Sequence, residues 1–166
     1  MPRVGIALGS NLGDRLANLR AAAVGLERIA EEGTEFLTAL IYQTEPKSCP
    51  PDSPDFLNTV VEFGFEGTPE DLLRKTQTIE QELGRIRGPE RNAPRTIDID
   101  LLYFGNDVVE NESLSLPHPR IRERRFVLQP LADIRPDLVL PGMNQTVAKM
   151  LDDLDCNEGR LEVVAQ

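Results

Sequence analysis

The stretch Arg95-Thr96-Ile97-Asp98-Ile99-Asp100-Leu101-Leu102 alternates apolar and acidic residues, and this alternation constrains the fold more than any other segment. Residues two apart on a β-strand point to the same face of the sheet. The pattern therefore predicts a strand with two different faces, with Asp98 and Asp100 together on one of them and their Cα atoms roughly 6.5 Å apart. Neighbouring carboxylates repel each other, and Mg2+ is usually held by one or two carboxylates plus substrate phosphates. The pair therefore predicts a magnesium site beside a phosphate-bearing substrate.

Arginine residues are concentrated on both sides of the aspartate pair. One cluster precedes the pair and the other follows the only histidine, His118; their members are Arg85, Arg87, Arg91 and Arg95, and Arg120, Arg122, Arg124 and Arg125. These clusters hold eight of the 18 basic residues, so basic charge is gathered near the aspartates of an acidic chain. Guanidinium groups bind phosphate oxygens in a bidentate manner. Either cluster alone would be interpreted as solvated surface. The position of both clusters beside two aspartates favours phosphate binding instead.

The composition disfavours several classes of protein. A net charge of −10 and an isoelectric point near 4.6 argue against broad binding to nucleic acid or to an anionic membrane. The apolar segments are too short for a signal peptide or a membrane span, so we expect a cytoplasmic location. Cys49 and Cys156 are interpreted as free thiols, and a bridge between them stays open. We expect a monomer with a single domain over residues 1–166.

Hydrophobic periodicity predicts the order of the secondary-structure elements. Strands are expected at residues 3–9, 36–44, 56–65 and from the aspartate pair to about 104, with helices at 16–33 and, capped by Thr68 and Pro69, up to Gly84. A hairpin should pair residues 108–109 with 114–116, and short helices should follow, the last at 146–154. The β-α-β-β-α-β order predicts a ferredoxin-like α+β fold, with helices on one face of an antiparallel sheet and a C-terminal helical extension. Its first and last strands should pair, which would bring residues 9–11 to the rim that carries the aspartates.

Several segments in order along the chain resemble 6-hydroxymethyl-7,8-dihydropterin pyrophosphokinase, an enzyme family of folate biosynthesis. The matching segments are Ala7-Leu8-Gly9-Ser10-Asn11-Leu12-Gly13, Tyr42-Gln43-Thr44-Glu45-Pro46, Phe56-Leu57-Asn58, Glu80 with Gly84-Arg85-Ile86-Arg87, Pro94-Arg95-Thr96-Ile97-Asp98-Ile99-Asp100-Leu101-Leu102, Pro117-His118-Pro119-Arg120 and Arg124-Arg125-Phe126-Val127-Leu128-Gln129-Pro130-Leu131. Each segment alone is a weak signal, whereas the ordered set covers nearly the whole chain. Some members of the family carry a tryptophan near the position of Asn92, and this chain has no tryptophan.

The resemblance implies a transferase that uses ATP as its co-substrate. ATP would give its β,γ-diphosphate to the hydroxymethyl oxygen of the pterin, and AMP would be released. The resemblance also implies two Mg2+ ions on Asp98 and Asp100, and loops that close over both substrates. The partners would then be small molecules, with no nucleic acid and no membrane.

The resemblance also assigns individual residues to the two substrates. Arg85 and Arg95 are the candidate catalytic residues, because they flank the arginine-rich loop and can neutralise charge that develops on the phosphates. The candidate ATP-binding residues are Gln77, Glu80, Arg87, His118 and Arg124, and the candidate pterin-binding residues are Thr44, Glu45, Phe56, Asn58 and Phe126.

Two of these assignments also have support from local chemistry. Asn58 is polar within an apolar strand, and an amide suits the donor and acceptor edge of a pterin, although an internal hydrogen bond would equally explain it. His118 lies between two prolines that extend its backbone, yet a lone histidine is often only a surface or core residue.

A nucleotide-sensing ferredoxin-like domain without turnover is the alternative to an enzyme. A carboxylate pair with two arginine clusters exceeds what a sensor needs, and release of AMP would separate the two functions. RNA binding is disfavoured by the acidic charge and by the absence of an RNA-stacking motif. The segment Gly9-Ser10-Asn11-Leu12-Gly13 has neither the spacing nor the lysine of a P-loop, so it is interpreted as a turn that supports the pocket.

Overall fold

The computed structural model describes residues 1–44, 55–84, 97–154 and 161–165. Its elements run in the order β1 (Arg3–Ser10), α1 (Arg15–Ile29), β2 (Leu37–Thr38), β3 (Ile41–Thr44), β4 (Phe56–Gly64), α2 (Pro69–Glu82) and β5 (Asp98–Phe104). The C-terminal part contains the hairpin β6 (Val109–Glu110) and β7 (Ser115–Leu116), a 3-10 turn η1 (Ile121–Glu123), α3 (Arg125–Ile134), α4 (Val147–Asp152) and β8 (Glu162–Ala165).

The main sheet has the strand order β5-β1-β4-β3-β8, with β2 also paired to β4, and its pairings are antiparallel. Strand β1 lies between β4 and β5, so the first strand of the β-α-β-β-α-β unit pairs with the last, as the ferredoxin-like order predicted. The register places Gly9 opposite both Asn58 and Asp98. Three segments that are far apart in sequence therefore meet at one end of the sheet.

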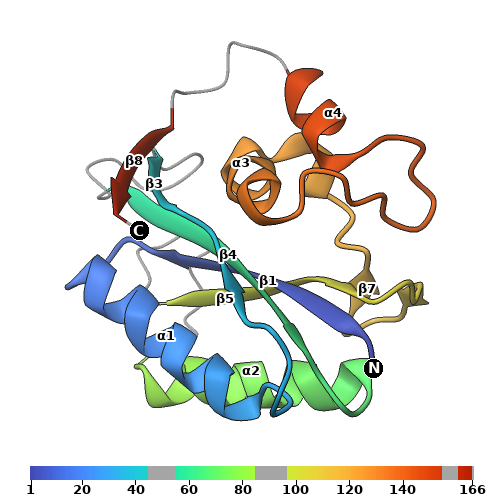
Figure 1. Ribbon diagram of the computed structural model, residues 1–166. Coiled ribbons are helices and arrows are strands. Elements are labelled where there is room, and N and C mark those ends of the chain that lie inside the picture. The colour runs from blue at the N-terminus through green and yellow to red at the C-terminus, as the bar shows by residue number, and fades with distance from the viewer. Residues whose placement is uncertain (45–54, 85–96, 155–160, 166) are drawn as a thin grey trace.

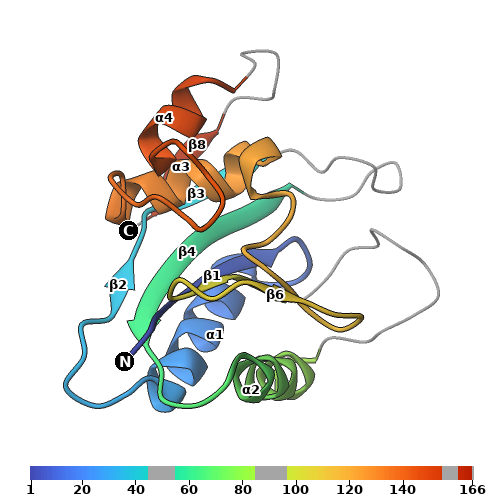
Figure 2. The same cartoon turned by 90° about the vertical axis from the view of Figure 1, so that its right-hand side faces the viewer.

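Helices cover both faces of this sheet (Figure 1). Helices α1 and α2 pack on one face over a core that includes Ile6, Leu8, Phe63 and Ile99. Helices α3 and α4 lie on the opposite face over a second core that includes Val60. The sequence predicted helices on one face and an extension after them, and the structure shows that the extension covers the second face (Figure 2).

Local capping explains where the first two helices begin. The Asp14 side chain accepts a hydrogen bond from the backbone N–H of Ala17 at 3.1 Å and caps α1. At α2, Thr68 is the N-cap and Pro69 the first helical residue, as the sequence predicted, and the structure adds a reciprocal capping box between Thr68 and Asp71. Both helices therefore start where a polar side chain satisfies backbone donors that the helix itself leaves unpaired.

Two sequence-based predictions of strands were wrong. The single strand expected at residues 36–44 is divided into β2 and β3, because the register against β4 shifts by one residue between Thr38 and Tyr42. The hydroxyl of Thr59 donates to the backbone carbonyls of Ala39 and Leu40, at 3.2 and 3.0 Å, and satisfies them at this irregularity. The C-terminal region was expected to be only helical, yet β8 adds to the sheet because the edge of β3 offers backbone partners that local sequence does not reveal.

A glycine in β1 permits a close approach between the sheet and a buried aromatic ring. A Cβ atom at Gly5 would lie 2.4 Å from the ring of Tyr103, which is 2 % exposed. The register between β1 and β5 shifts next to Gly5, and Leu102 and Tyr103 both contribute to the core under α3 and α4. The missing side chain at Gly5 therefore makes room for the ring in the second core.

The substitution Gly5→Ala should destabilise the fold by about 1–3 kcal/mol, the usual cost of overpacking a core. The measurement is urea unfolding of the variant beside the parent chain, with the same substitution repeated in a Tyr103→Ala background. The cost should shrink in that background because the ring is gone. An equal cost in both backgrounds would show that the ring does not cause the strain.

Candidate active site

The aspartate pair lies on the sheet face that carries α3 and α4. Asp98 pairs with Gly9 and Asp100 with Ala7 across the β1–β5 ladder, and Ala7 belongs to the core beneath α3 and α4. Ile99, between the two aspartates, belongs instead to the core beneath α1 and α2. Both aspartates are half-buried. The alternation in the sequence thus correctly predicted two carboxylates side by side on one face.

Three of the predicted pterin-binding residues gather at the same end of this face. Phe56 pairs with Thr44 across β3 and β4, and Asn58 follows two residues later on the same face of β4. The amide Nδ2 of Asn58 donates to Thr44 Oγ1 at 2.8 Å, and both residues are buried. The internal bond considered as the alternative for Asn58 therefore exists, and a contact of its amide with the pterin stays a prediction.

Gly9 contributes to this arrangement by having no side chain. A Cβ atom at Gly9 would lie 2.9 Å from Asn58 Oδ1 and 3.6 Å from Phe56 Cδ1. The Asn58 amide therefore lies across β1, between its own strand and Asp98. The sequence predicted Gly9 at the end of the first strand and near the aspartates but not its contact with Asn58, although an isolated glycine in a strand is itself a sign of a close approach.

Arg124 and Phe126, assigned to different substrates, are in contact at the start of α3. Arg124 is the N-cap residue of α3, and its guanidinium carbon lies 5.5 Å from the centroid of the Phe126 ring. This is the geometry of a cation–π contact. The helix N-terminus adds a region of partial positive charge beside the guanidinium, which favours anions.

His118 is held next to the aspartate strand. Its backbone N–H donates to the carbonyl of Leu102 at 2.8 Å, and its Nδ1 accepts the backbone N–H of Arg120 at 3.1 Å. Burial, followed by the charges of Arg124 and Arg120, lowers the pKa of His118 to about 4. The ring is therefore neutral at pH 7, and since Nδ1 accepts, the proton is on Nε2 and that atom is a hydrogen-bond donor.

Glu80 reaches the aspartate strand from α2. Its Oε2 accepts the backbone N–H of Ile99 at 2.8 Å, and the side chain is only 3 % exposed. The carboxylate therefore holds the β5 backbone between Asp98 and Asp100, a contact that sequence reasoning did not foresee. Gln77 lies one turn earlier on α2 and is half-buried. A contact of either residue with ATP stays a prediction.

Four of the residues assigned from the sequence, Glu45, Arg85, Arg87 and Arg95, lie outside the described residues. Within the described ranges, no group of three or more histidine, cysteine, aspartate or glutamate residues is placed to hold a metal ion. Two carboxylates suffice for Mg2+, however, because this ion keeps waters and takes substrate phosphates as its remaining ligands. Asp98 and Asp100 fit that requirement as oxygen donors on one face.

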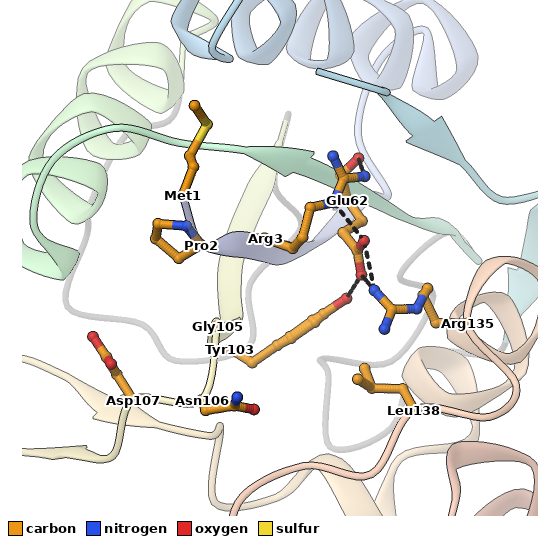
Figure 3. Close-up of a pocket in the computed structure, with 10 residues that line it drawn as sticks. All are labelled: Met1, Pro2, Arg3, Glu62, Tyr103, Gly105, Asn106, Asp107, Arg135 and Leu138. Carbon is orange, nitrogen blue, oxygen red and sulfur yellow. Dashed lines mark hydrogen bonds and ion pairs between the residues drawn. The ribbon is translucent and has the colours of Figure 1, made fainter. Parts of the chain in front are cut away.

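A separate pocket of about 530 Å³ lies at the opposite end of the sheet. Its lining residues are Met1, Pro2, Arg3, Glu62, Tyr103, Gly105, Asn106, Asp107, Arg135 and Leu138 (Figure 3). In this pocket Arg3 pairs with Gly64 in the β1–β4 ladder, at the far end from Gly9 and Asp98. The pocket therefore shares the sheet with the predicted site but not its residues.

The wall of this pocket contains a buried carboxylate that the sequence did not reveal. Glu62 is 1 % exposed; Arg3 Nε donates to its Oε1 at 2.9 Å, and the Arg135 guanidinium donates to both oxygens, at 2.8 and 2.6 Å. The hydroxyl of Tyr103 also donates to Glu62, and burial followed by this carboxylate raises the pKa of Tyr103. These donors compensate the cost of burying the charge and join β1, β4, β5 and the end of α3.

Comparison with known proteins agrees with this geometry. Residues 5–136 match the family model for 7,8-dihydro-6-hydroxymethylpterin-pyrophosphokinase. The chain belongs to this family. A 2-amino-4-hydroxy-6-hydroxymethyldihydropteridine pyrophosphokinase of Bacillus subtilis (strain 168) is 47 % identical over 129 residues, which are 78 % of this chain and 75 % of that protein. The family resemblance seen in the sequence is thus confirmed. The predicted enzyme class, which transfers diphosphate in folate biosynthesis, is confirmed with it.

Other proteins that are similar to this chain are much longer. A folic acid synthesis protein fol1 of Pneumocystis carinii is 39 % identical over 150 residues, which cover 90 % of this chain but 20 % of that protein. A crystal structure of an HPPK-DHPS in complex with substrates matches with a TM-score of 0.70 at 14 % identity, and covers 91 % of this chain and 44 % of that one. The chain thus spans a fifth of the first of these longer proteins and less than half of the second, and the structural likeness shows a shared fold.

Among the helices that the structure describes, none is long and apolar enough to cross a membrane.

The single histidine allows a direct test of the electrostatics at this site. In the protein without nucleotide, the NMR titration of the His118 ring should have its midpoint near pH 4, because burial and two arginines oppose protonation. Since the pKa in the folded state lies below that of an unfolded histidine, the contribution of His118 to stability is present above pH 6.5 and is lost as the pH falls toward 4. A midpoint near 6.5 in the folded protein would contradict the arrangement described above.

Proposed function

We propose that this chain transfers the β,γ-diphosphate of ATP to the hydroxymethyl oxygen of 6-hydroxymethyl-7,8-dihydropterin and releases AMP. The observation that carries the proposal is the pairing of Gly9 with Asp98 on one side and with Asn58 on the other, in a chain of the pyrophosphokinase family. This register sets a pair of carboxylates beside an amide suited to the pterin. A metal-bound phosphate chain and the acceptor hydroxyl can therefore meet across a single strand.

The pterin would bind at the end of the sheet formed by β3 and β4. Asn58 would pair with the donor and acceptor edge of the ring, held in place by its bond to Thr44. Phe56 and Phe126 would stack against the flat ring from two different elements, β4 and α3. Glu45, which follows Thr44 in the chain, completes the proposed set through its backbone.

ATP would bind with its phosphates between Asp98, Asp100 and the basic residues that precede and follow them. The two carboxylates would hold two Mg2+ ions, which when bound neutralise phosphate charge and polarise the phosphorus that is attacked. His118 would donate from Nε2 and Arg124 from its guanidinium to phosphate oxygens, since the ring is neutral and both groups flank the aspartate face. Gln77, Glu80 and Arg87 are the remaining residues proposed for the nucleotide.

Diphosphate transfer leaves little covalent work to the protein, so positioning and charge stabilisation should dominate. Arg85 and Arg95 are proposed to donate to charge that develops on the transferred group. The contact between Arg124 and Phe126 supports a common position for the two substrates, because residues proposed for the phosphates and for the pterin touch each other.

Membership of the family favours this transferase over a nucleotide-sensing domain without turnover. A monomeric state, a single domain and a cytoplasmic location stay predictions from the sequence.

Product identification tests the reaction itself. Incubation with ATP, Mg2+ and the hydroxymethyl dihydropterin should release AMP in step with pterin diphosphate, because the bond between the α- and β-phosphates is the one that breaks. The measurement is chromatographic separation of nucleotides over a time course, with a sample lacking the pterin as control. Formation of ADP would instead identify a simple kinase and contradict the proposal.

The metal assignment is tested by substituting the aspartates. Asp98→Asn and Asp100→Asn should each lower kcat/KM by on the order of 10³-fold, because each amide keeps the shape of the side chain but lacks the charge that holds Mg2+. Equilibrium titration of Mg2+ in the presence of a non-hydrolysable ATP analogue should show weaker binding.

Asp107→Asn is the matched control for these variants, since Asp107 is an exposed aspartate in the turn after the same strand. This variant should keep full activity and full metal affinity. Retained activity in both Asp98→Asn and Asp100→Asn, with folding verified by circular dichroism, would reject the metal site.

A further inference from the structure

Tyr42 connects the sheet to the helix that carries two of the proposed substrate contacts. It lies on β3 directly opposite Asn58, on the same sheet face as Asn58 and Thr44, and is 5 % exposed. Its hydroxyl donates to Asp133 Oδ2 on α3 at 2.7 Å. Gln129, also on α3, lies close enough to the same hydroxyl to lower its pKa. The hydrogen bond to Asp133 therefore joins β3 to α3.

The position of these two residues on α3 explains why such a contact matters. Phe126, Gln129 and Asp133 are spaced by three and four residues, so they lie along one side of the helix. Pro130 stands between Gln129 and Asp133, inside the helix. Proline has no backbone N–H, so the carbonyl of Phe126 loses its helical partner four residues later. The turn that carries Phe126 is thus held less firmly by the helix itself.

Tyr42 contacts α3 on both sides of this missing hydrogen bond. Asp133, which follows Pro130, accepts the hydrogen bond of the hydroxyl, and Gln129, which precedes Pro130, lies near the same hydroxyl. The first turn of α3 contains Phe126, whose ring is in contact with Arg124 at the helix start. The tyrosine is therefore placed to determine where the start of α3 lies relative to the end of β4 that bears Phe56 and Asn58.

Ionisation of the Tyr42 hydroxyl should not interrupt this contact at neutral pH. Burial, followed by the hydrogen bond and charge of Asp133, raises the pKa of Tyr42 to about 12. The phenol therefore stays protonated at neutral pH and remains the donor to the carboxylate.

We infer that Tyr42, through its hydroxyl contact with Asp133 and Gln129, is a positioning residue for pterin binding that fixes Phe126 over the sheet. The inference rests on the proposed function, because Phe126 matters only if the pterin stacks on it. Tyr42 itself need not touch the substrate. Its effect should therefore appear in the affinity for the pterin, with little change in the rate once the pterin is bound.

The central variant is Tyr42→Phe, which keeps the buried ring and removes only the hydroxyl. The equilibrium Kd and the KM for the pterin should rise on the order of tenfold, since a hydrogen bond to a charged group is lost, while kcat at saturating pterin changes less than about threefold. Asp133→Ala should reproduce this result, and the double variant Tyr42→Phe/Asp133→Ala should lose no more than either single one. Asp133→Asn, which keeps an acceptor oxygen, should restore most of the affinity.

Tyr103→Phe is the matched control, because Tyr103 is also a buried tyrosine whose hydroxyl donates to a carboxylate. It lies on the same sheet face but at the far end, bonded to Glu62 (Figure 3). This variant should lose a comparable amount of stability in urea unfolding and keep the pterin Kd of the parent chain. Equal losses of pterin affinity in Tyr42→Phe and Tyr103→Phe would show a general effect of stability and overturn the inference.

Two other results would also overturn it: a pterin Kd in Tyr42→Phe that equals the parent value, or additive losses in the double variant. Failure of the proposed function is distinguishable from these results, because the parent chain itself would then neither bind the pterin nor release AMP. The binding measurement uses the full chain with the hydroxymethyl dihydropterin and a non-hydrolysable ATP analogue, and it gives a readout that does not depend on turnover.

Discussion

The antiparallel pairing of β1 with both β4 and β5 is the constraint on which the rest of the structure depends. Because β1 is central, a single register sets Asn58 and Asp98 on either side of Gly9. A slip by one residue in either ladder would turn one of these side chains to the opposite face, since the side-chain period of a strand is two. Burial of the residues on β1 and β4 stabilises this register. The same pairing therefore determines both the core and the candidate site.

The face opposite α1 and α2 has two ends with different chemistry. At one end lie two half-buried carboxylates, an amide and a neutral histidine, which are among the residues proposed to bind the two substrates. At the other, the Glu62 carboxylate is saturated by two guanidinium groups and a phenol, so its hydrogen bonds join parts of the protein to one another. Burial and pairing of charge therefore do not by themselves identify a functional site, and the cluster around Glu62 is interpreted as structural.

Electrostatics and mechanical support are combined at the start of α3. The helix N-terminus, Arg124 and the donor Nε2 of His118 provide positive potential without an ionised histidine. The same helix is attached to the sheet through Tyr42 at Asp133 and through Arg135 at Glu62. These two contacts lie just beyond Pro130, where the helix has one backbone hydrogen bond fewer than an uninterrupted one.

The sequence by itself determined the order of the elements, the common face of Asp98 and Asp100 and the family, because each of these depends on local periodicity or on short motifs. The cap at Thr68 was likewise readable, since it involves only residues that are close in sequence. Only the tertiary structure decided the contacts between residues that are far apart in sequence. These include Glu80 on the backbone of Ile99, Tyr42 on Asp133, Gly9 beneath Asn58 and the edge strand β8. Such contacts depend on how elements pack in space, and a partner at a distance of tens of residues leaves no periodic signal in a single chain.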